Sequence, residues 1–170
     1  MMLIKPDNDV NQQEIAINKP TLYLVFTSLV SALFLNRIVM PYLQLEVIRN
    51  YPYATKKLLA KRIGETYSRI MKADANRITV SIRELGEGAI WRCGDGEPMP
   101  AAIMMCDIRQ GRDAHTRTAL SRALIDMCNE VLGLETGQLN IEFTQHSGDE
   151  MYHQRLGSFS SEWSPDEGSL

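Results

Sequence analysis

The second half of this chain repeats the first half at a constant offset of 61 residues, without gaps, from Pro41 and Ala102 onward. The superimposed residues share charge or size: Glu46 with Asp107, Thr55 with Thr116, Lys56 with Arg117, Leu59 with Leu120, and Ile90-Trp91 with Met151-Tyr152. A shared period of this length indicates two copies of one supersecondary unit. The chain must therefore fold as a tandem of similar halves.

Each copy is predicted to form a strand, a helix of about 18 residues and a second strand. The first strands are predicted over 42–48 and 103–109. Apolar residues then recur at i, i+4, i+8 and i+11, the spacing of one helix face: Leu59, Ile63, Tyr67 and Ile70, and Leu120, Leu124, Cys128 and Val131. Asp113 is a plausible N-cap for the second helix.

The strand after each helix is predicted from alternating apolar and polar residues, over 78–83 and 139–143. A β-α-β unit has parallel strands and a right-handed crossover. The predicted fold class is therefore α+β, with tandem β-α-β repeats forming a four-stranded sheet and two helices on one face.

The open face of this sheet favours self-association. Leu43, Leu45 and Val47 are apolar, and we expect the first strand to be buried on more than its helix side. A second copy of the chain would supply the missing layer.

Composition limits the class of function. The chain has 170 residues, 44% of them hydrophobic, and a net charge of −3, which is typical of one ordinary domain. A pI of 5.6 argues against a nucleic-acid partner, because phosphate binding needs a basic face.

Three cysteines without a CxxC spacing suggest neither a disulfide framework nor a zinc site, and they fit a reducing cytoplasm. The three histidines lack a metal-binding spacing, and GxGxxG and GKS/GKT loops are absent. We expect no metal and no cofactor.

Residues 1–39 read as an N-terminal extension that is apolar over 21–35 (TLYLVFTSLVSALFL). A spanning helix needs about 20 apolar residues, and a secretory signal begins with a positive stretch, so neither description fits this shorter run. We interpret 1–39 as dispensable for the fold and not part of a mature protein that starts near Met40. The alternatives are a membrane anchor and a docked extra helix. The repeats 41–101 and 102–160 form one domain, and 161–170 is predicted to be a mobile tail.

From Met40 the chain reads MPYLQLEVIRNYP, and the first copy ends in RITVSIRELGEGAIWRCG. Together with the repeat, these motifs resemble the tautomerase superfamily over residues 41–160. The first copy resembles 4-oxalocrotonate tautomerase. The second, with DIRQGRDAHTRTALSRALID, resembles the second half of fused members such as cis-3-chloroacrylic acid dehalogenase and malonate semialdehyde decarboxylase.

The resemblance implies a homotrimer and a catalytic N-terminal proline, here Pro41, exposed by removal of the preceding methionine. An α-amino group titrates near pH 8 in water, and burial beside cations lowers its pKa toward working pH. Such an amine is a general acid or base. With residues 1–40 attached, however, the Pro41 nitrogen is an amide without basicity, and Pro41 is then simply the first residue of a strand.

Arg109 and Arg112 follow the first strand of the second copy, where the resemblance implies a pair that holds a substrate carboxylate. A guanidinium fork suits planar carboxylates. The alternative is a solvated turn.

Other positions depart from the family pattern. Tyr51 and Thr79 replace arginines of the short tautomerases, and Ile90 replaces a pocket phenylalanine. Tyr67, Glu142 and His153 are the nearest equivalents of the dehalogenase's histidine, tyrosine and glutamate, and none matches. Tyr67 could donate a hydrogen bond or belong to the core, and His153 could be a second acid or base or a surface residue.

The leading hypothesis is a cofactor-independent tautomerase or isomerase that acts on a small keto-enol or unsaturated carboxylic acid, with no nucleic-acid or membrane partner. The first alternative keeps the superfamily but changes the reaction to that of a hydratase, dehalogenase or decarboxylase. The second is a non-catalytic oligomer with a membrane-tethering N-terminal segment.

Overall fold

The computed structural model describes residues 40–154 and 157–160, without the side chain of His153. The predicted extension over 1–39, its apolar run, and the predicted tail over 161–170 lie outside the described residues.

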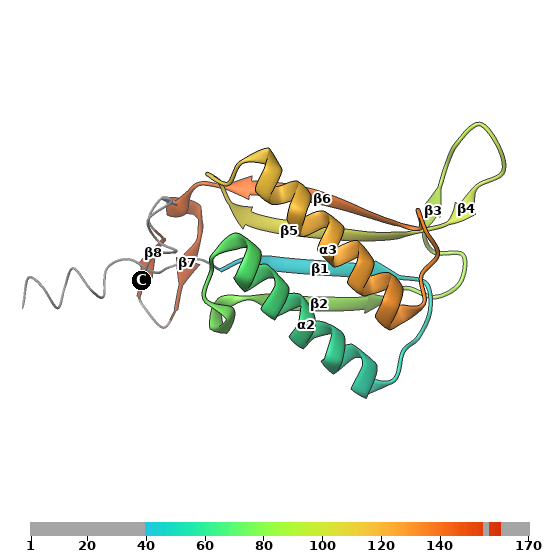
Figure 1. Ribbon diagram of the computed structural model, residues 1–170, viewed down its shortest axis with the longest axis horizontal. Helices are drawn as coiled ribbons and strands as arrows, with labels where there is room; N and C mark the ends of the chain where they lie inside the picture. Colours follow the sequence, from blue (N-terminus) through green and yellow to red (C-terminus); the bar gives the residue numbers. More distant parts are fainter. Residues whose placement is uncertain (1–39, 155–156, 161–170) are drawn as a thin grey trace, which may run out of the picture. The chain divides into compact units, whose positions relative to one another are not determined.

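A four-stranded sheet is the centre of the domain (Figure 1). Its strands are β1 (Tyr42–Val47), β2 (Thr79–Glu84), β5 (Ala102–Arg109) and β6 (Leu139–His146), in the order β2-β1-β5-β6. The pairs β1·β2 and β5·β6 are parallel, and the central pair β1·β5 is antiparallel. The helices α2 (Tyr53–Met71) and α3 (Ala114–Leu132) cover one face, so the predicted fold class is confirmed.

The elements follow the 61-residue offset closely. Both helices have 19 residues, and α3 begins and ends 61 positions after α2. Short elements complete each repeat. In the first repeat they are the 3-10 helix η1 (Ala75–Arg77), which precedes β2, and the hairpin of β3 (Trp91–Arg92) and β4 (Met99–Pro100). In the second repeat the 3-10 helix η2 (Gly148–Glu150) and the hairpin of β7 (Tyr152–His153) and β8 (Ser158–Phe159) follow β6. The two hairpins lie at opposite ends of the sheet (Figure 1).

The core lies between the helices and the sheet. Leu43, Leu45 and Val47 of β1 are buried there, with Met104, Cys106 and Ile108 of β5. Most residues of the two predicted apolar helix faces are buried: Leu59, Ile63, Tyr67, Leu120, Leu124 and Cys128. The last predicted residue of each face, Ile70 and Val131, is only half-buried, and the next residue, Met71 or Leu132, is buried instead.

The apolar residues of β1 do not cover the open face of the sheet, and burial of that face by a second copy of the chain stays a prediction. Those residues all point to the helices, because successive side chains of a strand alternate between faces. The open face of β1 carries a row of polar side chains instead: Tyr42 Oη donates to Gln44 Oε1 (3.0 Å), and Gln44 Nε2 donates to Glu46 Oε1 (2.8 Å). Arg83 of β2 extends this row, with Nη1 donating to Glu46 Oε1 (3.3 Å).

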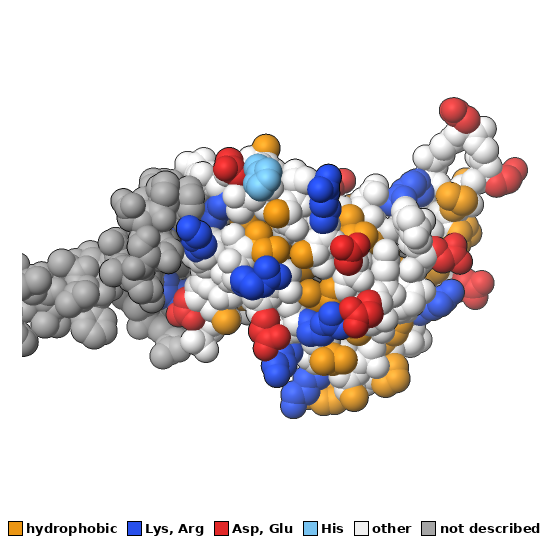
Figure 2. Space-filling model, in the orientation of Figure 1, with side chains coloured by type: hydrophobic (Ala, Val, Ile, Leu, Met, Phe, Trp, Pro, Cys, Tyr) orange, Lys and Arg blue, Asp and Glu red, His pale blue; other side chains and the backbone are white. Residues whose placement is uncertain are grey.

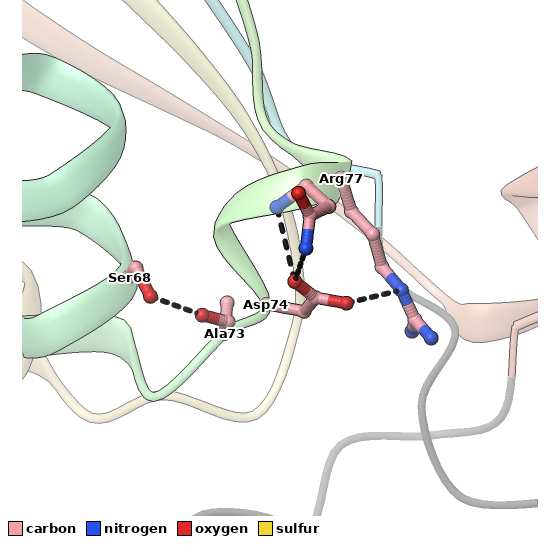
Figure 3. Close-up of polar contacts among 5 residues, drawn as sticks. Ser68, Ala73, Asp74 and Arg77 are labelled. Atoms are coloured by element: carbon pink, nitrogen blue, oxygen red, sulfur yellow. Dashed lines mark hydrogen bonds and ion pairs between the residues drawn. The ribbon is translucent and has the colours of Figure 1, made fainter. Parts of the chain in front are cut away.

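The turn between α2 and β2 is held by side chains (Figure 3). Ser68 Oγ donates to the carbonyl of Ala73 (2.5 Å), and Asp74 accepts from the backbone N–H of Asn76 (3.0 Å). Arg77 Nε lies 3.4 Å from Asp74 Oδ2. The turn thereby positions the start of β2. There the amide of Thr79 donates to the carbonyl of Pro41, the residue before β1.

The helix-covered face is a mixed charged surface, with Lys and Arg interspersed among Asp and Glu (Figure 2). Arg62 of α2 makes two hydrogen bonds to Glu130 of α3, at 2.9 and 2.7 Å. Asp113 caps α3 as predicted, accepting from the Thr116 amide at 2.6 Å. None of the described helices combines the length and the apolar character that crossing a bilayer requires.

Candidate functional site

Pro41 is buried directly before β1. Its carbonyl accepts a hydrogen bond from the Thr79 amide (3.0 Å), which holds it at the start of β2. On the other side, Tyr42 pairs with Asp107 in the antiparallel ladder between β1 and β5. Because the strands run in opposite directions, the start of β1 lies beside the end of β5, so Pro41 and Arg109 lie at the same end of the sheet.

Arg109 is the last residue of β5 and is fully buried, with 0% of its surface exposed. It pairs with His146, the last residue of β6. Burying a guanidinium is unfavourable unless hydrogen bonds and charges compensate. The alternative that this arginine lies in a solvated turn is therefore wrong.

Arg112 is also buried, at 3% exposure. Its Nε and Nη2 donate to the carbonyl of Met71 (3.3 and 3.0 Å), and its Nη1 donates to the carbonyl of Arg109 (3.3 Å). The side chain thus ties the last carbonyl of α2 to the end of β5, and Arg117 Nη1 donates in turn to the Arg112 carbonyl. Arg112 thus contacts the backbone of Arg109 and also fixes the helix end, while the role of the two side chains as a carboxylate-binding pair stays a prediction.

Tyr67 lies one helical turn before Met71 and is fully buried. Its hydroxyl has no hydrogen-bond partner among the described residues. Burial raises the pKa of Tyr67, and the positive charges of Arg112 and Arg109 oppose that rise only in part. The phenol is therefore a neutral hydroxyl group.

Comparison with known proteins gives structural matches only. No family model matches the chain, and no curated protein matches its sequence. Among solved structures it is similar to native Ps01740 (22% identity, 66% of this chain and 99% of that chain, TM-score 0.59). It is also similar to N1, a member of the cis-3-chloroacrylic acid dehalogenase family, with 19% identity over 75% of this chain and 88% of that chain and a TM-score of 0.64. A third similar structure is F6 fused 4-OT, an asymmetric trimer, with 15% identity over 69% of this chain and 94% of that chain and a TM-score of 0.61. The chain has the tautomerase-superfamily fold.

His146, which pairs with Arg109 in the ladder between β5 and β6, is a residue that sequence reasoning missed. Nε2 of His146 lies 3.9 Å from Asp107 Oδ1, and Nδ1 lies 3.8 Å from Glu150 Oε2. Glu150 is itself held by the amide and hydroxyl of Ser147, both at 2.9 Å. No motif spacing points to His146. Its position at the end of β6, which is parallel to the arginine-bearing strand β5, could have indicated that it lies near Arg109.

The other candidate residues, His153 and Glu142, belong to β7 and β6 of the second repeat. The backbone of His153 lies in β7, and its side chain is outside the described residues. Glu142 is exposed on β6, opposite Met105. Trp91, Cys93, Glu97 and Pro98 line a shallow pocket of 340 Å³ on the β3–β4 hairpin, at the other end of the sheet.

Two of the cysteines are core residues of this fold. Cys106 and Cys128 are buried free thiols, and burial raises the pKa of each to about 12. They are therefore poor nucleophiles, since the thiolate is the reactive form. Within residues 40–154 and 157–160, no three His, Cys, Asp or Glu side chains are grouped closely enough to hold a metal ion.

Proposed function

We propose that this protein is a cofactor-independent tautomerase or isomerase, with Pro41 as an N-terminal amine that transfers a proton on a small keto-enol or unsaturated carboxylic acid. The observation that carries the proposal is the burial of Pro41 beside the end of a strand that bears the buried Arg109. An amine at Pro41 and the guanidinium of Arg109 would then lie at the same end of the sheet, where one small anionic substrate could contact both.

The proton transfer follows from the charges at this end of the sheet. A secondary amine buried near two guanidinium groups loses part of the stabilisation of its ammonium form, so its pKa falls below the value in water. The neutral amine removes a proton from the carbon or enol oxygen of the substrate and returns it at the other position. Arg109 and Arg112 bind the carboxylate and stabilise the negative charge that develops in the enolate.

This chemistry requires that the peptide bond between Met40 and Pro41 is cleaved or never made. In that peptide bond the Pro41 nitrogen is an amide, which carries no proton and is not basic. The active form is therefore a chain that begins PYLQLEV, and residues 1–40 are absent from it. A form that retains the upstream residues is the non-catalytic alternative.

The active assembly is proposed to be a homotrimer. F6 fused 4-OT, which shares this fold, is described as a trimer. In such an assembly, neighbouring subunits would pack against the face of the sheet that the helices leave open. This face carries the half-buried row of polar side chains along β1.

A dehalogenase-type reaction is the second candidate, because the similar structure N1 is described as a member of the cis-3-chloroacrylic acid dehalogenase family. In that reaction the protonated Pro41 amine polarises the bound acid while water adds to it. Glu142, the nearest positional equivalent of the dehalogenase's tyrosine, is an exposed carboxylate on β6, and this departure from the dehalogenase pattern favours the tautomerase reaction.

The test compares three purified proteins: a chain beginning at Pro41, the same chain with residues upstream of Pro41 retained, and the Pro41→Ala variant with a free N-terminus. Ketonisation of phenylpyruvate enol is followed, together with halide release from 3-chloroacrylate. The free-proline chain should be active, and both changes should lower kcat/KM by about 100-fold or more, the typical size of a general acid–base contribution. Pro52→Ala, at an exposed proline before α2, is the matched control and should leave kcat/KM unchanged. Equal activity of the blocked and free chains would refute the mechanism.

A further inference from the structure

The pocket on the β3–β4 hairpin has no part in the proposed function, because the hairpin lies at the end of the sheet opposite to Pro41 (Figure 1). Its volume of 340 Å³ is within the range of small-molecule sites. The side chains that line it therefore indicate the chemistry of a ligand that it could hold.

The walls of this pocket are fixed to the rest of the domain. Arg92 Nη2 donates to the carbonyl of Gln138 (3.1 Å), and Arg92 Nη1 donates to the carbonyl of Gly137, both between α3 and β6. Trp91 Nε1 donates to the carbonyl of Gly88 (2.8 Å). The polar atom of the indole is thus already used, so the ring offers the pocket only carbon and π surface.

The hairpin of the second repeat shows what is missing from the first. There Tyr152 pairs with Phe159, and the two rings meet edge to face with their centroids 5.3 Å apart. Trp91 pairs with Pro100 instead, and within the described part of the chain no second ring packs against it. The residue remains 48% exposed. The indole is therefore open to a ligand.

The charge of the pocket is negative. Glu97 lines it together with Trp91, and among the described residues no side chain forms an ion pair or hydrogen bond with the Glu97 carboxylate. Asp95 adds a second negative charge to the same loop, and Figure 2 shows acidic side chains on the hairpin. The nearby guanidinium of Arg92 is bound to backbone carbonyls. A carboxylate beside an open indole attracts organic cations, through its charge and through cation–π contact.

We propose that Trp91 and Glu97 form a binding site for a small organic ammonium ion. The Glu97 carboxylate pairs with the ammonium group, and the indole of Trp91 and the ring of Pro98 contact the apolar body of the ligand. The site selects a cation, whereas the substrate proposed for Pro41 is an anion. Because the two sites lie at opposite ends of the sheet, failure of either proposal leaves the other in place.

The experiment uses Cys93 as a reporter, since this exposed thiol lines the same pocket. Cys106 and Cys128 are buried with a raised pKa of about 12, so iodoacetamide should alkylate them far more slowly. The rate of Cys93 alkylation in the full chain is followed by mass spectrometry with increasing 2-phenylethylammonium or 2-phenylethanol. These probes share one apolar body and differ in charge. The cation should halve the rate at a concentration about fivefold lower than the alcohol, the size expected of an exposed ion pair with cation–π contact.

Glu97→Gln should remove the preference for the cation and leave protection by the alcohol unchanged. Trp91→Leu should weaken protection by both probes, because it removes the aromatic wall. Glu65→Gln is the matched control, an exposed carboxylate on α2, and should keep the preference. Each variant is compared with its own rate without a probe, so a change in the reactivity of Cys93 itself does not enter the result.

Three outcomes would overturn the assignment. In the first, neither probe protects Cys93 of the unchanged protein. In the second, the alcohol protects as well as the cation. In the third, the preference for the cation survives Glu97→Gln. This variant changes an exposed side chain that makes no printed contact with the domain, so a loss of folding does not explain its result, and circular dichroism of the variant verifies the fold.

Discussion

The two ends of the sheet have the same backbone plan and different side chains. The 61-residue offset relates each residue of the site end to one at the opposite end: Pro41 to Ala102, Arg109 to Ile48, Arg112 to Tyr51, and Tyr67 to Cys128. One end thus buries two guanidinium groups and a phenol, while the other is filled by small, apolar or weakly polar side chains. The comparison teaches that the duplicated unit supplies the fold, and that substitutions at one end supply the candidate chemistry.

The helix ends differ in the same way. At the apolar end, α3 closes on Gly133, which has a positive φ of 64° and donates its N–H to the carbonyl of Asn129 (3.0 Å). Glycine adopts this conformation without steric penalty. At the site end, α2 closes on Lys72 at φ 50°, and a side chain of the other repeat, Arg112, binds the Met71 carbonyl. The site therefore contributes to the stability of the repeat that it faces.

The shared core should respond equally in both repeats, and this is the largest expected effect on stability. Leu59 and Leu120 are equivalent and fully buried, so Leu59→Ala and Leu120→Ala should each lower the free energy of unfolding by about 2–5 kcal/mol. Denaturant unfolding of the two variants measures this. A large loss for one and almost none for the other would show that the repeats do not share one cooperative core.

The protein should lose stability when the hydrogen bonds between Arg112 and the end of α2 are removed. Arg112→Met deletes the hydrogen bonds to the carbonyls of Met71 and Arg109, and should lower the free energy of unfolding by about 1–3 kcal/mol. Arg49→Met, at an exposed arginine in the equivalent turn of the first repeat, should change it by less than about 0.5 kcal/mol. Equal effects of the two substitutions would contradict the structural role of Arg112.

The helix starts offer a smaller contrast. Asp113 caps α3, whereas its equivalent Pro52 makes no side-chain hydrogen bond at the start of α2. Asp113→Ala should lower the free energy of unfolding by about 1 kcal/mol, and Asp113→Asn should change it much less, because asparagine is also a good N-cap. Thermal unfolding of both variants decides this, and an equally large loss with asparagine would show that the cap hydrogen bond is not the cause.

The start of α2 is held by a carboxylate from β2, which predicts a pH effect. Glu84 accepts from Lys56 Nζ (2.8 Å) and from the Tyr51 amide (2.6 Å), and these hydrogen bonds lower the pKa of Glu84. A lowered carboxyl pKa adds stability above the pKa of the unfolded state, and this stability is lost as the pH falls through the lower, folded-state pKa.

Glu84→Gln should therefore be less stable than the unchanged protein at neutral pH, and the difference should shrink toward low pH. Unfolding measured from about pH 7 to pH 3 provides the test. Glu87→Gln, at an exposed carboxylate after β2, should match the unchanged protein throughout. A Glu84→Gln difference that stays constant with pH would contradict the ionic contribution.

Sequence reasoning predicted the fold because both of its signals, the repeat offset and the alternation of apolar residues, are visible in the sequence without knowledge of any tertiary contact. It also predicted the cap of α3, since Asp113 contacts an amide only three residues away. The contact of Arg112 with Met71 could not be predicted, because it joins the two repeats across 41 positions of the chain. His146 was missed for the same reason, since only the pairing of β5 with β6 brings it beside Asp107 and Arg109.

The central claim is that Pro41 is the N-terminal residue of the active protein. The most direct measurement is the intact mass and N-terminal sequence of the protein expressed from its native upstream DNA without an N-terminal tag. We expect a chain that begins PYLQLEV, with a free secondary amine at the end of the sheet that carries Arg109. A mature chain that retains residues before Pro41 would contradict it, because the nitrogen would then be an amide that cannot transfer a proton.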